Sequence, residues 1–146
     1  MLHTHKEILD QIRTHAETHY PEEGAGFILG RASTDDRYVE RILPIQNQFE
    51  FGDRHHRYLI TPQDMIQSEL EAEELGLVIL GVFHSHPNHP AIPSEFDRER
   101  ALPWFSYVIT SVHQDGAQES RSWRLTDDRR FEEEEIMILP ANKEIS

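Results

Sequence analysis

LVILGVFHSHP, at residues 77–87, is the most informative segment of this 146-residue chain. Its first part, residues 77–83, is apolar throughout and has the length of a strand, which predicts a central strand buried on both faces. His84 and His86 follow at the end of this apolar run. Because side chains two positions apart on a strand point to the same face, we expect the two imidazoles to converge on one point.

Helix and strand signals alternate on both sides of this strand. Thr4 and Glu7 predict a capping box for a helix over about residues 5–19, and Pro21 should stop that helix. Thr61 and Gly76 predict the start and the end of a second helix. Its expected apolar face consists of Met65, Ile66, Leu70 and Leu75.

The other predicted elements are short. They are strands at 27–29, 38–45, 58–60, 106–112 and 121–125, and a helix at 94–101.

The segments between these elements are polar. We expect loops at 46–57 and 87–93, and a solvated face or helix at the acidic run 132–135. Neither a repeat nor a linker interrupts the pattern. The sequence therefore predicts one domain spanning residues 1–146, with an α/β or α+β arrangement of helices around a single sheet.

The composition excludes several classes of function. With 14 basic and 27 acidic side chains the net charge is −13, which argues against non-specific binding to nucleic acid or anionic membranes. The absence of cysteine excludes disulfide scaffolds, thiolate zinc fingers, iron–sulfur clusters and cysteine nucleophiles. The N-terminal residues lack the apolar core of a secretory signal, and the apolar run at 77–83 is far shorter than the ~20 residues that span a bilayer. We therefore expect a cytoplasmic protein.

Histidines are numerous, ten in all, and most of them are expected to serve no site. His15 and His19 are four residues apart, a spacing that can chelate a metal, but they lie off the apolar face of the first helix and should be exposed. His3 and His5 should be exposed at a frayed terminus. Three further histidines are expected in loops, without joint ligation: His55, His56 and His89. Three aromatic residues are expected to pack in the core or on the sheet: Trp104, Phe105 and Trp123.

Ser94 and Asp97 complete the segment that begins with the two histidines. On its own, Ser94-x-x-Asp97 predicts a capping box for a short helix. If the preceding loop folds back, Asp97 also brings a carboxylate to His84 and His86. Two neutral imidazoles and a carboxylate form a zinc-type ligand set whose open fourth position holds water.

This combination resembles the JAMM (MPN+) metalloprotease motif, which is His-x-His, seven residues, Ser, two residues, Asp. The spacing of His84, His86, Ser94 and Asp97 is the same. The segment PEEGAGFILG, residues 21–30, is similar to the family's upstream segment, in which a glutamate stands three positions before a glycine. That rule selects Glu23 rather than Glu22, a choice that rests on the resemblance. Overall, the similarity extends from Ile8 to about Ile136.

The resemblance implies a fold and a set of roles. The fold would be the MPN/JAMM, cytidine-deaminase-like α/β fold, a mixed sheet flanked by helices. His84, His86 and Asp97 would hold Zn²⁺, with water as the fourth ligand. Glu23 would act as general acid/base, with Glu22 as the open alternative, and Ser94 would hydrogen-bond the developing oxyanion.

The resemblance also implies a function. The expected activity is zinc-dependent hydrolysis of peptide or isopeptide bonds at the C-terminal Gly-Gly tail of a ubiquitin-like or sulfur-carrier protein. The alternative is a non-catalytic MPN-type protein-interaction module. A zinc deaminase is excluded because its Pro-Cys-x-x-Cys segment requires cysteine. The nature of the released group and the oligomeric state stay open. Because the chain is acidic, we expect local basic residues to matter at the substrate groove: Arg54, Arg57 or Arg98.

Overall fold

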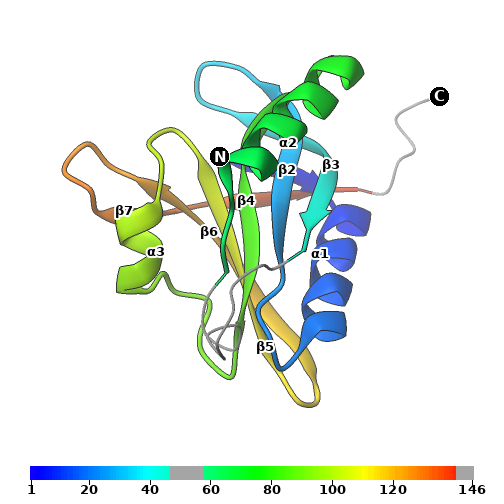
Figure 1. Ribbon diagram of the computed structural model, residues 1–146, viewed down its shortest axis with the longest axis vertical. Coiled ribbons are helices and arrows are strands. Elements are labelled where there is room, and N and C mark those ends of the chain that lie inside the picture. Colours follow the sequence, from blue (N-terminus) through cyan, green and yellow to red (C-terminus); the bar gives the residue numbers. More distant parts are fainter. Residues whose placement is uncertain (47–57, 141–146) are drawn as a thin grey trace.

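The computed structural model describes residues 1–46 and 58–140 of the chain, and Figure 1 shows the arrangement of its elements. The helices are α1 (Lys6–His19), α2 (Pro62–Leu75) and α3 (Glu95–Arg100). The strands are β1 (Leu2–His5), β2 (Ala25–Ala32), β3 (Arg37–Ile45), β4 (Val78–Pro87), β5 (Ser106–His113), β6 (Gly116–Leu125), β7 (Phe131–Glu134) and β8 (Ile136–Leu139). None of the helices in the described ranges is long and apolar enough to cross a membrane.

The strands form one mixed sheet in the order β7-β6-β5-β4-β2-β3-β1-β8. β4 lies inside it, antiparallel to β2 and parallel to β5, which confirms the predicted central strand. It is also longer than the apolar run, because the sheet pairing continues through His84 and His86. Gly81 is required in this strand, since a Cβ there would lie 1.8 Å from the backbone oxygen of Ser106.

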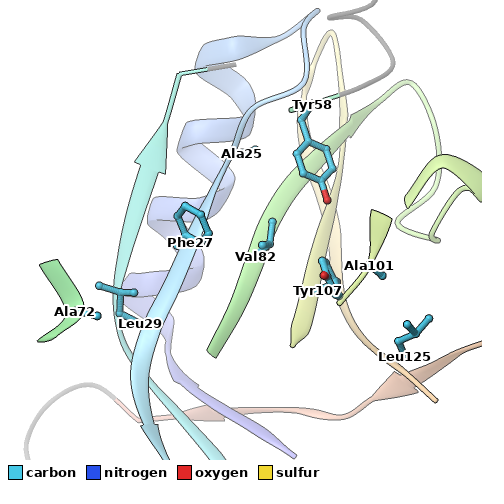
Figure 2. Packing of buried hydrophobic residues seen from close by; sticks show 9 residues of the cluster. All are labelled: Ala25, Phe27, Leu29, Tyr58, Ala72, Val82, Ala101, Tyr107 and Leu125. Atoms are coloured by element: carbon cyan, nitrogen blue, oxygen red, sulfur yellow. The ribbon is translucent and has the colours of Figure 1, made fainter. Parts of the chain in front are cut away.

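Helices cover both faces of the sheet. Ile8 and Ile12 of α1 pack on one face, against residues such as Phe83. On the opposite face, Ala72 of α2 joins a second buried cluster, whose side chains Figure 2 shows together: Ala25, Phe27, Leu29, Tyr58, Val82, Ala101, Tyr107 and Leu125. The architecture is therefore α/β, a mixed sheet flanked by helices, as expected.

The second helix begins and ends where its sequence predicts, but of the predicted apolar face only Met65 packs against the core. Thr61 and Asp64 form the capping box, and Gly76 ends the helix in the left-handed conformation at φ 71°. Ile66 and Leu70, however, are 58% and 55% exposed, whereas Ser68 and Ala72 are buried. Small side chains on the buried side let the helix lie close to the sheet.

The N-terminus differs from the prediction of a frayed end. Residues 2–5 form β1, which pairs in parallel with both β3 and β8. Thr4 is therefore buried in the sheet, and His5 is the N-cap residue of α1 without a side-chain cap, so the predicted capping box is wrong. His3 is not exposed as expected: it stacks on Tyr38 and its Nε2 lies 2.9 Å from Asp36.

Two further predictions about local structure need correction. The acidic run 132–135 is not a helix, because residues 131–134 pair with β6; Glu132, Glu133 and Glu135 are exposed, as a solvated face requires, and Glu134 is the exception. Glu134 is buried there and accepts hydrogen bonds from the hydroxyls of Ser106 (2.8 Å) and Ser122 (3.0 Å). The predicted strand at 58–60 is an irregular segment, although Tyr58 is buried. Most of the predicted loop at 46–57 lies outside the described residues.

Candidate metal centre and active site

The two histidines lie at the carboxyl end of β4, on the same face as Val82. Both are buried, and the ring centroids of His84 and His86 are 5.1 Å apart. Alternation along the strand thus brings the imidazoles together, as the sequence predicts. Ser85, between them, points to the opposite face, where its hydroxyl accepts a hydrogen bond from the backbone of Gly24.

Asp97 reaches the histidines because of the way in which α3 begins. Ser94 is the N-cap residue: its Oγ accepts the Asp97 N–H at 3.1 Å, and the Asp97 carboxylate accepts the Ser94 N–H at 2.8 Å. This confirms the predicted capping box. The same carboxylate lies beside both imidazoles, with its oxygens 3.1 Å from His86 Nε2 and 3.8 Å from His84 Nε2.

These three residues form the only candidate metal site among the described residues. One ligand atom from each of His84, His86 and Asp97 falls within a mutual distance of 4.8 Å. Burial lowers the pKa of His84 to about 4, so its imidazole is neutral at pH 7. Burial opposes ionisation of Asp97, but the two histidines and the Ser94 amide outweigh it and hold the pKa of this carboxyl well below its usual range. Neutral imidazoles and an ionised carboxylate are the forms that bind a metal.

The surroundings of the two imidazoles also fit a metal. His86 Nδ1 lies 3.0 Å from the backbone oxygen of Pro90, so it donates there and leaves Nε2 as the ligand atom. In the described part of the chain, neither ring nitrogen of the buried His84 makes a well-aligned hydrogen bond, and the interaction of His84 with the Ser85 backbone is weak. A buried polar atom without a partner is costly. A metal bound at Nε2 would satisfy the nitrogen that faces Asp97.

Hydrogen bonds to three consecutive backbone carbonyls hold the loop between the histidines and α3. His86 donates to the Pro90 oxygen, as described above. The Ser111 hydroxyl donates to the backbone oxygen of His89 at 2.6 Å, and the Trp123 indole N–H donates to that of Ala91 at 3.0 Å. Sequence reasoning missed these contacts, because β5 and β6 provide them from residues far along the chain. Trp123 was expected to do no more than pack on the sheet.

Glu23 lies on the segment that leads into β2. Ala25 is opposite His84 in the sheet, so Glu23 falls two positions further along, beside His86. Its side chain is buried, with 3% of its surface exposed, whereas Glu22 is half-buried. Glu23 lines a cavity of about 290 Å³ whose other walls are His86, His89, Pro90, Ile92 and Ser94.

Ser85 holds this segment in place. Its Oγ accepts the Gly24 N–H at 2.8 Å, and its own N–H donates to the Gly24 backbone oxygen at 3.0 Å. Sequence reasoning passed over Ser85, because only its position between two ligands marks it. Ser94, an expected site residue, is exposed and lines the same cavity. Since Ser94 Oγ accepts the Asp97 N–H, its O–H proton can be donated toward the cavity.

His15 and His19 are not the exposed pair that the sequence suggested. Their rings pack together with centroids 4.2 Å apart, and His15 also meets the edge of Phe83. A Cβ on Gly24 would come within 2.8 Å of the His15 ring, so the rings of His15 and His19 pack directly against the segment that carries Glu23. The prediction failed because the loop after α1 folds back over these histidines.

The remaining predicted residues lie in varied places. His89 is exposed at the cavity, and Arg98 pairs with Glu95 on α3. Phe105 packs against the core as expected, whereas Trp104 is 46% exposed. One face of its ring lies against the guanidinium of Arg37, and its φ is 79°. Four residues lie outside the described ranges: Arg54, His55, His56 and Arg57.

Comparisons with known proteins identify the family of this chain. The family model described as prokaryotic homologues of the JAB domain matches residues 5–126. The chain is similar to a "Probable TtuB-protein conjugate cleaving protease" of Thermus thermophilus, at 33% identity over 75% of this chain and 69% of the relative. It is also similar to a "Desampylase" of Haloferax volcanii, at 33% identity over 80% of each chain.

Solved structures show the same fold. A protein from Desulfitobacterium hafniense superposes with a TM-score of 0.86 at 29% identity, covering 99% of this chain and 97% of that one. A JAB1/MPN domain protein from Archaeoglobus fulgidus superposes with a TM-score of 0.55 at 18% identity, covering 95% and 99%. The chain belongs to the prokaryotic JAB (JAMM/MPN) family, whose motif the residues from His84 to Asp97 resemble.

Proposed function

We propose that this protein hydrolyses peptide or isopeptide bonds in conjugates of a ubiquitin-like protein, and that residues 1–146 form a single domain with this activity. The observation that carries the proposal is the buried group of His84, His86 and Asp97 beside a cavity lined by Glu23 and Ser94. The relatives named as a conjugate-cleaving protease and as a desampylase support the same class of reaction.

The metal that we propose is Zn²⁺, held by His84, His86 and Asp97. Two histidines, one carboxylate and an open fourth position form a ligand set typical of catalytic zinc. When bound, zinc lowers the pKa of a coordinated water to about 7 and polarises the scissile carbonyl.

The side chains of the chain itself complete the mechanism. Glu23 accepts a proton from the attacking water and returns it to the leaving amine, which is the work of a general acid/base at hydrogen-bond distance. Its burial at the wall of the cavity that His86 and Ser94 also line supports this role. Ser94 donates its hydroxyl to the oxygen that gains charge. A donor of this kind contributes about 3 kcal/mol of transition-state stabilisation.

The substrate that we propose is the C-terminal Gly-Gly tail of a ubiquitin-like or sulfur-carrier protein, in the cytoplasm. Because glycine has no side chain, a Gly-Gly tail can approach the cavity at Glu23 closely. The alternative, a non-catalytic interaction module, would need no metal ligands. The complete ligand set therefore favours an enzyme.

The test uses zinc-loaded protein and a ubiquitin-like protein with a peptide or a lysine-linked protein after its Gly-Gly. Mass spectrometry of the products should find a chain that ends in Gly-Gly. Glu23→Gln should abolish cleavage while one zinc per chain remains, and Glu22→Gln is the matched control that should keep activity. Binding of the ubiquitin-like protein without cleavage, by a protein that holds no metal, would instead support the interaction module.

A further inference from the structure

The ring of Tyr58 stacks on the ring of His84. The two centroids are 4.4 Å apart and the ring planes are inclined by 28°. Tyr58 is itself buried, with 7% of its surface exposed, and it belongs to the core cluster of Val82 and Tyr107. The stack is therefore a fixed contact inside the protein.

The two histidine ligands are held in different ways. His86 donates Nδ1–H to the Pro90 carbonyl, the usual means by which a protein orients a metal-bound imidazole. Within the described part of the chain, His84 makes no well-aligned hydrogen bond at Nδ1, and its interaction with the backbone of the adjacent Ser85 is weak. Packing is the stronger restraint on its ring plane among the described residues, and the Tyr58 ring lies against the His84 ring with the two planes inclined by 28°.

We propose that Tyr58 is a positioning residue that orients His84 for metal binding, in place of the well-aligned hydrogen bond that His84 lacks among the described residues. This inference rests on the proposed function, since it concerns the same metal centre. The Tyr58 ring prevents His84 from tilting, so that Nε2 stays directed at the site that it shares with Asp97 (3.8 Å). The face of the Tyr58 ring makes this contact and the hydroxyl takes no part in it, so a phenylalanine at this position should orient His84 equally well.

The place of Tyr58 in the chain explains why it can act in this way. It comes three residues before the N-cap Thr61, whose capping box fixes the start of α2. Figure 2 shows the Tyr58 side chain beside the strands of the core, with its hydroxyl directed toward Tyr107. The segment before α2 thus contributes to the metal centre without providing a ligand.

The experiment compares the wild type with Tyr58→Phe, Tyr58→Leu and a control, Tyr38→Leu. Tyr38 also stacks on a histidine, His3, with centroids 4.5 Å apart, but this pair lies on β3 and β1. Zinc affinity is measured by competition with a chromophoric chelator. Tyr58→Leu should weaken zinc binding about 10–100-fold, the cost of losing an outer-shell partner. Tyr58→Phe and Tyr38→Leu should bind zinc as the wild type does.

A second readout does not depend on activity or affinity. In the cobalt-loaded protein, the visible absorption bands report the geometry of the ligands. They should shift in Tyr58→Leu and stay unchanged in Tyr58→Phe. If Tyr58→Leu does not fold, nuclear Overhauser contacts between the Tyr58 and His84 rings in the zinc-loaded wild type decide the matter, because their absence would overturn the proposal.

The outcomes separate the inference from the proposed function. A wild type that binds no zinc would refute the metal centre itself. A wild type that binds zinc, with Tyr58→Leu equally tight and spectroscopically the same, would refute the role of Tyr58 alone. Equal weakening in Tyr58→Phe and Tyr58→Leu would also overturn it, because the hydroxyl would then be the active group.

Discussion

Replacing Ser85 by Ala tests whether the Glu23 segment is positioned from β4. Ser85 Oγ is buried and accepts the Gly24 N–H at 2.8 Å. Ser85→Ala removes that acceptor and leaves the Gly24 N–H buried without it. The other contact, from the Ser85 N–H to the Gly24 carbonyl at 3.0 Å, involves only backbone atoms and survives.

Two effects of different size follow from the lost hydrogen bond. A buried donor without its partner costs about 1–3 kcal/mol of stability. In a protein of this size each kcal/mol lowers the melting temperature by about 2–4 °C, so a fall of about 2–12 °C is expected. The second effect is on catalysis, because Glu23 precedes Gly24. A displacement of ~1 Å in a reacting group lowers kcat on the order of 100-fold.

The assay combines thermal unfolding, zinc content and cleavage kinetics, with Ser106→Ala as the matched control. Ser106 is equally buried and pairs with Arg37 and Glu134, but it lies opposite Gly81, away from the histidines. Both variants should lose stability and keep zinc. Only Ser85→Ala should show a lower kcat, and its KM should change little. Equal kcat values for Ser85→Ala and Ser106→Ala at similar stability would refute the idea that Ser85 positions the general base.

Three further outcomes are expected. Zinc at 1,000 times its Kd should stabilise the wild type against unfolding by about 4 kcal/mol, and a chelator, or His84→Ala, should abolish this stabilisation in calorimetry. Burial, with a smaller effect of His19, lowers the pKa of His15 to about 4. An unfolded histidine binds its proton near pH 6.5, so stability falls as the pH drops from 6.5 to 4. The free energy of unfolding is measured by denaturant titration at pH 7 and at pH 5. Between these two pH values it should fall by about 1 kcal/mol less in His15→Gln than in the wild type, after allowance for solvent screening. An equal fall in both proteins would contradict a buried neutral His15. Trp123→Phe removes the indole donor to Ala91 and should cost about 0.5–1.5 kcal/mol, with faster amide exchange in residues 88–93; unchanged exchange would show that the loop is held without Trp123.

Local signals predicted the parts of the fold that local physics decides. The β4 run, the Thr61 start and Gly76 end of α2, and the Ser94 cap all depend on residues within a few positions of one another. β1 could not be predicted in this way. Leu2 and His3 pair with β3, and all four residues pair with β8, more than a hundred residues later. No local pattern specifies such partners.

The same limit applies to the candidate site. The convergence of His84 and His86 follows from strand geometry alone, whereas the position of Glu23 beside His86 depends on the pairing of β2 with β4. Two adjacent acids after Pro21 are by themselves typical of a solvated turn. Only the motif resemblance selected Glu23, and burial distinguishes it from Glu22 in the folded chain. Ser111 and Trp123 offered no signal, because their partners are backbone carbonyls that a sequence does not reveal.

Ser94-x-x-Asp97 shows why a structural and a functional interpretation of one motif can both hold. A capping box requires an acidic side chain to fold back on the N-cap backbone, which fixes its rotamer. Asp97 is held in this way by the Ser94 N–H, at 2.8 Å. A ligand carboxylate must be ionised and oriented before a metal arrives, and a backbone N–H that donates to it favours both. The start of α3 therefore orients the carboxylate of the third ligand. The spacing of three positions between Ser94 and Asp97 in the motif is the spacing that a capping box at a helix start requires.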